Sequence, residues 1–522
     1  MADPTQPVSG APISEGGGQP VEHLDVLVVG AGLSGIGAAH HLQTDCPWAS
    51  YAVFEARGAI GGTWDLFRYP GIRSDSDMFT LGYPFRLWPG QKSIADGDSI
   101  LRYIEDTATE AGIDEKIRFH HRITHAAWSS DEARWLITAE RSDTGETVQV
   151  TCGFLFSCSG YYRYDRGHEP DFAGKDDFTG QIVAPQFWPE DLDYADKQVV
   201  VIGSGATAIT LVPSLAKGGA QVTMLQRSPT YVASLPGTNP LANLLRKLLP
   251  ERVSAPTIRW MNALMTQGSY RLSRVRPELM KRILLKGVSR QLPDGYDVDT
   301  HFTPKYNPWD ERLCVVPDGD LFKAIRKGTA EVVTDHIDRF TADGIRLVSG
   351  QEIPADIIVT ATGLELLFIG GINVTVDGVE VEVSERFAYK GMMLEGVPNM
   401  AMAIGYTNAS WTLKADLTSG YVTRLLNHLR ATGMRQATPE NHDPALEPAP
   451  LLSLSSGYIT RAADQFPKQG DKFPWQVHQS YLRDYRALKN SAVDRDTMVF
   501  SNPAPVGASR SSATASAAAP TS

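Results

Sequence analysis

Two glycine-rich turns, each placed between an apolar β-branched run and helix-compatible sequence, limit the possible folds of this chain most strongly. The first, Gly30–Gly35, follows the run DVLVVGAG at 25–32, and the second, Gly203–Ala208, follows QVVVIGSG at 198–205. A third run of this kind, DIIVTATG, lies at 356–363. Short apolar strands that end in glycine are typical of parallel sheets that hold a nucleotide at their carboxyl ends. The sequence therefore predicts an α/β protein with two Rossmann-like dinucleotide-binding domains.

Composition supports a globular enzyme and excludes several other classes of protein. Of the 522 residues, 42% are hydrophobic and 21% are charged, which are ordinary globular values, and the net charge of -11 argues against general nucleic-acid binding. No apolar run reaches the roughly 18 residues that a spanning helix needs, and residues 1–22 lack the apolar core of a signal peptide. The four cysteines form no C-x-x-C pair, which favours a reducing cytoplasm and no metal site. They are Cys46, Cys152, Cys158 and Cys314.

The first turn has the spacing G-x-G-x-x-G, with Gly30, Gly32 and Gly35 at the fixed positions. In such a turn the first glycine permits the tight bend, the second admits a pyrophosphate, and the third allows close contact between helix and strand. The next strand, YAVFEAR, carries Glu55, which lies about twenty residues further on, where a carboxylate accepts hydrogen bonds from ribose hydroxyls. This turn resembles a site for FAD.

The second turn has Ala208 in the third place, and its next strand, QVTMLQRS, ends in Arg227 and Ser228 instead of an acid. A guanidinium pairs with a phosphate in a bidentate fork, so a cation at this position favours the 2′-phosphate of NADP. A plain surface arginine at the end of a strand is the alternative. We expect this turn to bind NADPH.

Residues 240–300 differ in character from the rest of this acidic chain. Between Arg246 and Arg290 there are eleven Lys or Arg residues but only two acids, Glu251 and Glu278, and Leu and Met recur at helical spacing. The pattern predicts a helical insertion with a basic face. Such a face is either a solvated surface or a site for an anionic ligand or a membrane surface.

The segment after Glu55 shows a resemblance to a known family. Residues 61–75, GGTWDLFRYPGIRSD, match the G-G-x-W-x4-[FY]-P-G-x3-D pattern of Baeyer-Villiger monooxygenases. Further matches are WPEDLDYADKQVVVIGSGATA at 188–208, YNPWDERLC at 306–314, DIIVTATGL at 356–364, YKGMM at 389–393 and GYTNASWTLKADL at 405–417. Together they cover about residues 22–507 and are similar to the ethionamide-activating subgroup of the class B flavin monooxygenases.

The resemblance implies an FAD-containing enzyme that uses NADPH and O2 to convert ketones to esters or lactones, and that also S-oxidises sulfides and thioamides. Arg312 matches the active-site arginine of the family, which stabilises negative charge as it develops without losing its own proton. Asp75 matches the acid that orients this arginine. A purely structural ion pair is the alternative role for these two residues.

The same matching implies two sets of cofactor contacts and no metal site. The residues implied for FAD are Gly30, Gly32, Ser34, Gly35, Glu55, Thr63, Trp64, Asp65, Leu66, Asp75 and Ile123. The residues implied for NADP are Arg73, Ser74, Asp75, Gly203, Ser204, Gly205, Ala206, Thr207, Ala208, Ile209, Arg227 and Ser228. Trp64 also fits a plain core position.

The third strand run ends in a glycine turn that is typical of a chain returning to the flavin domain. We therefore predict a discontinuous FAD domain and an NADP domain that contains the helical insertion. The predicted boundaries are 22–162 and 355–500 for the FAD domain, 163–354 for the NADP domain, about 240–300 for the insertion, and 1–21 and 503–522 for disordered ends. Localisation is expected to be cytoplasmic, with peripheral membrane contact through 246–290 as the alternative.

One departure from the family pattern bears on function. The family's linker fingerprint is F-x-G-x3-H-x3-W-[PD], and in the segment from Phe178 to Pro189 the histidine place is taken by Ala184. In the family that histidine is associated with coupling of NADPH binding and domain movement to oxygenation. An uncoupled NADPH oxidase or a flavin-binding sensor is therefore the alternative function. A disulfide reductase would need a redox cysteine pair, which this sequence lacks.

Overall fold

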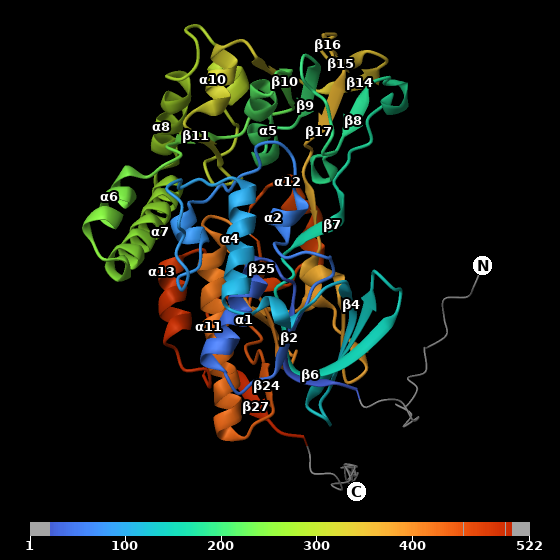
Figure 1. Ribbon diagram of the computed structural model, residues 1–522, viewed down its shortest axis with the longest axis vertical. Coiled ribbons are helices and arrows are strands. Elements are labelled where there is room, and N and C mark those ends of the chain that lie inside the picture. Colours follow the sequence, from blue (N-terminus) through green and yellow to red (C-terminus); the bar gives the residue numbers. More distant parts are fainter. Residues whose placement is uncertain (1–20, 453, 496, 504–522) are drawn as a thin grey trace, which may run out of the picture.

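The protein has two halves, each built on its own sheet, stacked along the long axis of the molecule (Figure 1). The computed structural model describes residues 21–452, 454–495 and 497–503. The disordered ends predicted for 1–21 and 503–522 lie outside these residues, apart from positions 21 and 503. The α/β class predicted from the sequence is confirmed by the two sheets and the helices that cover them.

The larger sheet, in the lower half of Figure 1, runs in the order β20-β19-β4-β5-β6-β1-β2-β3, and β23 also pairs with β6. Its strands are β1 (His23–Val29), β2 (Tyr51–Phe54), β3 (Ile117–Arg118), β4 (His121–Ser129), β5 (Arg134–Arg141), β6 (Thr147–Ser157), β19 (Asn373–Val376), β20 (Val379–Glu380) and β23 (Met400–Met402). β1 pairs in parallel with β2 and β6, and Val26, Leu27 and Val28 are fully buried. Burial on both faces explains why this strand is continuously apolar.

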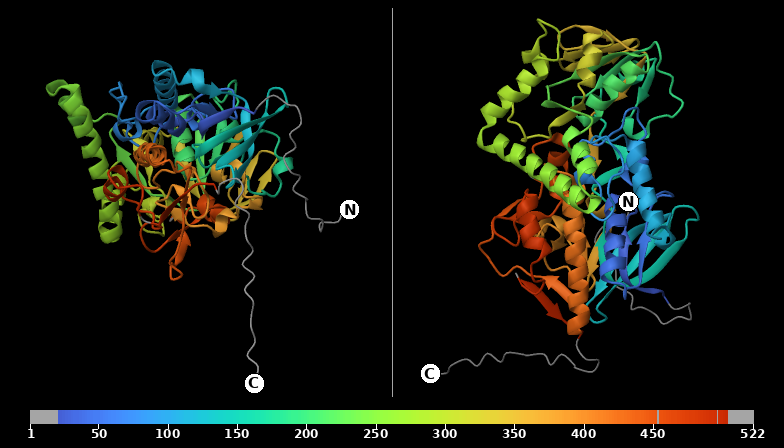
Figure 2. Two further views of the ribbon diagram at one scale, coloured as in Figure 1. Left: turned by 90° about the horizontal axis from the view of Figure 1, so that it is seen from below. Right: turned by 60° about the vertical axis from the view of Figure 1, so that its left-hand side comes forward.

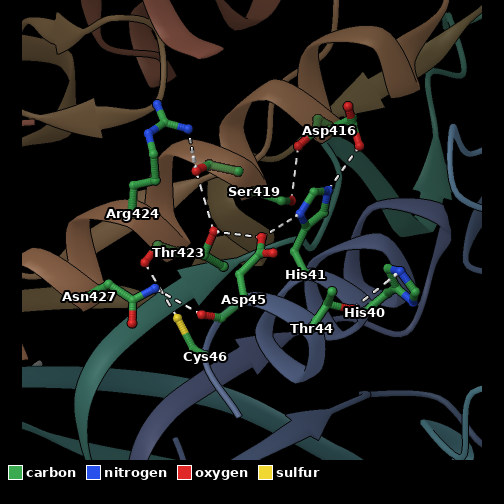
Figure 3. Close-up of polar contacts among 12 residues, drawn as sticks. His40, His41, Thr44, Asp45, Cys46, Asp416, Ser419, Thr423, Arg424 and Asn427 are labelled. Carbon is green, nitrogen blue, oxygen red and sulfur yellow. Dashed lines mark hydrogen bonds and ion pairs between the residues drawn. The ribbon is translucent and has the colours of Figure 1, made fainter. Parts of the chain in front are cut away.

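Two long helices, α1 (Leu33–Asp45) and α11 (Trp411–Thr432), lie against each other beside this sheet. Figure 3 shows the polar contacts that join them. The His41 ring of α1 lies between two carboxylates, with Nδ1 3.1 Å from Asp45 Oδ2 and Nε2 2.9 Å from Asp416 Oδ1 on α11. Thr423 Oγ1 also donates to Asp45 Oδ2, at 3.1 Å. These contacts fix the last turn of α1 on α11.

Shorter helices and two-stranded sheets complete this half. The helices are α2 (Thr63–Leu66), α3 (Met78–Leu81), α4 (Gly97–Glu110), α12 (Gly457–Ala462) and α13 (Tyr481–Asp484). The paired strands are β21 (Ala388–Tyr389) with β22 (Met393–Leu394), β24 (Gln436–Pro439) with β27 (Met498–Ser501), and β25 (Pro448–Pro450) with β26 (Lys468–Gly470).

The smaller sheet has five parallel strands in the order β13-β10-β9-β17-β8. They are β8 (Gln181–Val183), β9 (Gln198–Ile202), β10 (Gln221–Gln226), β13 (Ala330–Thr334) and β17 (Ile357–Thr360). Helices α5 (Ala206–Lys217) and α10 (Asp320–Arg326) pack together in this half. Also present are the meander of β14 (Ile337–Thr341), β15 (Gly344–Leu347) and β16 (Glu352–Pro354) and the pair of β11 (Val232–Leu235) and β12 (Cys314–Pro317).

The chain passes between the halves twice, through β7 (Tyr162–Gly167) and β18 (Leu364–Leu366), which pair antiparallel. The sequence analysis predicted that the chain returns to the FAD domain at residue 355, but the structure places the crossing later. β17 follows that boundary but pairs with β8 and β9 of the smaller sheet, because its apolar residues fill the place between those strands. The return to the larger sheet comes after β17, at β18. The division into FAD and NADP domains remains a prediction.

The predicted insertion is helical and lies at the outer edge of the molecule (Figure 1). Its helices are α6 (Pro240–Leu248), α7 (Glu251–Val275), α8 (Pro277–Ser289) and α9 (Val298–Phe302). Arg246 donates to the carbonyl oxygens of Trp88 and Gly90, and Arg259 to those of Phe79 and Gly82. Two of the eleven basic residues thus attach the insertion to the half that contains the larger sheet.

Candidate active site

A large cavity of about 1220 Å³ lies between the two halves and reaches both nucleotide turns. It exceeds the roughly 300–1,000 Å³ of ordinary ligand pockets. Most of the residues predicted from the sequence line it. They are Gly30, Gly32, Ser34, Glu55, Thr63, Trp64, Arg73, Ser74, Asp75, Ile123, Gly203, Ser204, Gly205, Ala206, Thr207, Arg227, Ser228 and Arg312.

The remaining predicted contact residues do not line the cavity. They are Gly35, Asp65, Leu66, Ala208 and Ile209. Ala208 and Ile209 are buried in the core under α5. The Asp65 carboxylate is held by Arg57 and Arg68, each with an N–O distance of 2.5 Å. Asp65 therefore supports the cavity wall through its neighbours, whereas the sequence suggested a direct contact.

The first turn is enclosed and provides a fitting place for a pyrophosphate and a ribose. Gly30 has a φ of +95°, and a Cβ added at Gly32 would lie 3.6 Å from Gly62 Cα, so a side chain there would narrow the space. Glu55 is 6% exposed, and its two carboxylate oxygens accept hydrogen bonds from the backbone N–H groups of Ala31 (2.7 Å) and Arg57 (2.8 Å). Burial raises the pKa of Glu55, although the two N–H donors oppose this shift.

The second turn is open towards the cavity and offers cations for a phosphate. Arg227 and Ser228 are both exposed, and Ser204 Oγ donates to Ser228 O at 3.0 Å. Arg73 lines the same cavity and pairs through Nη1 with Asp320 at 2.6 Å. Its buried Nη2 has no hydrogen-bond partner among the described residues. An orphaned guanidinium nitrogen and an exposed arginine that line one cavity fit a phosphorylated dinucleotide.

Arg312 and Asp75 meet in the cavity wall, although they are far apart in the sequence. Arg312 Nε lies 3.7 Å from Asp75 Oδ2, and the arginine side chain is 35% exposed. Burial alone would lower the pKa of Arg312, but the charge of Asp75 raises it above its ordinary value. The guanidinium is therefore a fixed positive charge.

Four aromatic residues that the sequence analysis did not single out line the same cavity as this pair. They are Tyr161, Tyr162, Trp411 and Tyr458. Burial raises the phenol pKa of Tyr458, which the positive charge of Arg312 opposes, and burial raises the pKa of Tyr161 as well. Trp411 Nε1 donates to Ser34 Oγ of the first turn at 2.8 Å. Aromatics directly after the buried strand β6 were a usable signal for Tyr161, whereas nothing in the sequence marked Tyr458.

The described residues offer no support for two other kinds of redox or metal site. All four cysteines are free and buried, and burial raises the pKa of Cys158 and Cys314, the two that line the cavity. A buried thiol of high pKa is a poor nucleophile. No cluster of metal-ligating side chains occurs in the described part of the chain.

Ala184 lies outside the cavity wall, at the start of a short helical turn, 185–187. The next polar residue, Gln186, is buried and donates through Nε2 to the carbonyl oxygens of Arg163 and Tyr164 on β7, each at 3.0 Å. Phe187 is 52% exposed and cannot compensate for the missing imidazole by packing. Gln186 is thus the residue that ties this linker to the crossing strand.

Comparisons with known proteins identify similar sequences and folds. A family model described as flavin-binding monooxygenase-like matches residues 87–294, and one described as an NAD(P)-binding Rossmann-like domain matches residues 28–96. The chain is 55% identical over 488 residues to the FAD-containing monooxygenase EthA of Mycobacterium tuberculosis. That alignment covers 93% of this chain and 99% of the relative.

Two solved structures share the fold. Oxidized steroid monooxygenase bound to NADP matches with a TM-score of 0.72 and 21% identity over 92% of this chain and 100% of its own. A complex of OTEMO with FAD and NADP matches with a TM-score of 0.66 and 22% identity over 80% and 87% of the two chains. The cavity thus lies in a two-domain fold in which both of those proteins bind NADP.

Proposed function

The chain belongs to the flavin-binding monooxygenase-like family of FAD-containing monooxygenases, and on this premise we propose that it is a Baeyer-Villiger enzyme using FAD, NADPH and O2. Its substrates are ketones, which it converts to esters or lactones, together with sulfides and thioamides, which it S-oxidises. The turn at Gly30 would hold FAD, and Arg73, Arg227 and Ser228 would hold NADPH. Bound FAD would accept hydride from NADPH and provide the place where O2 is activated.

The main support for this proposal is the Arg312–Asp75 pair in the cavity wall between the two turns. Oxygenation of a ketone develops negative charge on oxygen, and a preoriented cation in a partly enclosed cavity lowers the energy of that charge. Arg312 keeps its proton because its pKa is raised, so it acts as a charge and hydrogen-bond donor and not as an acid. Asp75 holds the guanidinium in place.

The aromatic wall suits an apolar carbonyl or sulfide substrate. Tyr161, Tyr162 and Trp411 present ring surface to the cavity. Because burial raises the phenol pKa of Tyr161 and Tyr458, both remain neutral at working pH and bring no negative charge next to the reacting oxygen. Apolar walls around a few polar groups are the usual lining of a small-molecule site.

The test uses the holoenzyme with an apolar ketone, NADPH and O2, and measures ester formed against NADPH consumed. Arg312→Ala should keep bound FAD and some NADPH oxidation but lose at least about 100-fold in ester formation, the typical cost of removing such a donor. Arg346→Ala, which removes an exposed arginine paired with Glu352, is the matched control and should behave as wild type. Normal ester yield in Arg312→Ala would exclude the arginine from the reaction.

An uncoupled NADPH oxidase is the second candidate, because Ala184 replaces the fingerprint histidine. If the imidazole matters for coupling, Ala184→His should raise the fraction of NADPH that ends in ester and lower hydrogen peroxide release, by less than about tenfold. Phe187→His, three residues away and exposed, is the control. Wild-type enzyme that releases only hydrogen peroxide with every ketone and sulfide tested would favour the oxidase.

A further inference from the structure

Exposed apolar side chains are concentrated on one part of the surface, the α6–α8 arm, which comprises residues 240–289. Ten of the sixteen exposed large hydrophobic residues among the described part of the chain lie there. They are Leu241, Leu244, Leu248, Val253, Leu264, Met265, Leu272, Val275, Leu279 and Ile283. Soluble monomers rarely leave such a group uncovered, so it indicates a contact surface.

Helical spacing gathers these residues into stripes. Leu241, Leu244 and Leu248 recur at i, i+3 and i+7 on one face of α6. On α7, Val253 and Val275 lie eleven residues either side of Leu264, which is three helical turns in each direction, so the three side chains share one face. Intramolecular packing does not account for them, because all six are at least 44% exposed.

The buried residues of α7 differ from the exposed apolar ones. Its five buried residues include three polar ones, Ser254, Asn262 and Ser273. A helix that packed only against its own protein would bury its large apolar residues and expose its polar ones. α7 buries Ile258 and Ala263 together with the three polar residues, yet it leaves Val253, Leu264 and Val275 exposed. Uncovered apolar side chains of this kind are expected where a second apolar medium lies outside.

Unpaired basic side chains occur on the same helices as the stripes. Seven exposed Lys or Arg residues of this region enter no ion pair among the described residues, namely Lys247, Arg252, Arg271, Arg276, Arg282, Lys286 and Arg290. The chain as a whole carries -11, so this concentration of positive charge is local. Apolar stripes bordered by Lys and Arg are the composition of helices that lie in the interface of an anionic membrane.

The shape of the molecule allows such a contact. In Figure 1, α6 and α7 stand at the outer edge, and the left view of Figure 2 shows a long helix of this region projecting beyond the body. No helix in the described residues is long and apolar enough to cross a membrane. We propose that the α6–α8 arm docks the protein onto the surface of an anionic phospholipid bilayer, with its leucine and valine stripes in the headgroup layer.

A second copy of the chain is the main competing occupant. In a symmetric pair the same patches would meet, and the six unpaired cations of one arm would face the same six on the other. An anionic bilayer instead neutralises them. The proposal goes beyond the oxygenation chemistry and does not depend on it, because vesicle binding is measured without substrate or NADPH.

The test is flotation of the full-length holoenzyme with vesicles of phosphatidylglycerol and phosphatidylcholine, compared with phosphatidylcholine alone. Binding should require phosphatidylglycerol and should weaken in about 1 M salt, where the Debye length falls to about 3 Å. The double variant Leu244→Ser/Leu248→Ser should reduce partitioning at least about tenfold, because two exposed leucines no longer enter the headgroup layer. Lys247→Gln/Arg252→Gln should reduce the preference for phosphatidylglycerol.

The control variant is Val348→Ser/Val379→Ser, which removes two equally exposed apolar residues elsewhere and should bind as wild type does. Thermal melting and NADPH oxidation without vesicles should be unchanged in all variants. Equal binding to neutral vesicles, no binding at all, or unchanged binding of Leu244→Ser/Leu248→Ser would overturn the proposal. So would a wild-type dimer in sedimentation velocity that this variant dissociates, since the arm would then be a subunit contact.

Discussion

The turn at Gly30–Gly35 has no room for a side chain at its third position, whereas the same position of the turn at Gly203–Ala208 is already an alanine. A Cβ added at Gly35 would lie 1.8 Å from Gly30 O. At the second position a Cβ added at Gly32 would lie 3.6 Å from Gly62 Cα, and one added at Gly205 would meet no atom within 4 Å. The polar side chains at the ends of the strands that follow the two turns also differ in exposure. Glu55 is buried and bonded to two backbone N–H groups, and Arg227 is exposed.

The helices that follow the two turns, α1 and α5, differ in how they are held in place. The last turn of α1 is fixed to α11 by His41, Asp45, Asp416 and Thr423 (Figure 3). α5 contains no charged side chain except Lys217 and is held mainly by apolar contacts in the core of its half. A closed, fixed turn suits a cofactor that stays bound, and an open one suits a cofactor that must enter and leave in every cycle.

The largest expected effect comes from adding a side chain at the third position of the first turn. Gly35→Ala would drive a Cβ into Gly30 O, and we expect a loss of about 3 kcal/mol or more in the free energy of unfolding, together with loss of bound FAD. No matched change exists in the second turn, whose third position is already Ala208. Gly205→Ala, at the second glycine of that turn, adds a Cβ that meets no atom within 4 Å and should keep FAD and stability while raising the KM for NADPH. Chemical unfolding and flavin absorbance check both, and similar FAD content in the two variants would end the distinction between the turns.

An intermediate effect is expected at the exposed end of the second site. Arg227→Ala removes the proposed partner of the 2′-phosphate, so the KM for NADPH should rise about tenfold to 100-fold while that for NADH changes little. Steady-state kinetics with each cofactor measure this. Arg346→Ala again serves as a control for loss of an exposed arginine. Equal losses with NADPH and NADH would assign Arg227 a structural role.

The smallest effect concerns the α1–α11 contact and depends on pH. Burial alone would lower the pKa of His41, but its bonds to Asp416 and Asp45 outweigh burial and raise it above the ordinary value of about 6.5. The neighbouring His40 ring, which stacks on Phe85, has a lowered pKa and opposes this slightly. The stabilisation from His41 is therefore complete below the unfolded-state pKa and disappears as pH rises through the raised pKa of the folded state.

His41→Asn should consequently lower stability by about 1 kcal/mol at acidic pH and by less at alkaline pH. Thermal melting between about pH 6 and pH 9 gives the comparison. His442→Asn, at an exposed histidine near Glu440, should leave the pH profile unchanged. If His41→Asn leaves the pH dependence of the melting temperature unchanged, the contact of His41 with Asp45 and Asp416 is uncharged or plays no part in stability.

Features within one strand–turn–helix unit could be predicted from the sequence. The glycine spacing and the positions of Glu55 and Arg227 led to residues that do line the cavity. The reason is physical, since a strand, a tight turn and a helix fix the distances between residues some twenty positions apart. The helical insertion could be predicted as well, because its Leu, Met and basic residues recur with helical spacing.

Features that depend on how the two halves fit together could not be read in the same way. Tyr458 reaches Arg312 from a short helix near the end of the chain, and no local pattern marks it. β17 has the apolar composition of any buried strand, so its composition could not show which sheet it joins. Nor could the spacing of the apolar residues in α7 show which of its faces would remain uncovered.

The sequence by itself determined that there are two nucleotide turns of different chemistry, a basic helical insertion and an alanine in place of the fingerprint histidine. These follow from residue identity and short-range spacing, which the backbone turns directly into geometry. Only the tertiary structure decided that Gly35 has no room for a side chain, that Arg312 meets Asp75, and that the apolar stripes of the arm face outward. Such contacts join residues distant in the chain, and their formation depends on strand order and on how the halves pack.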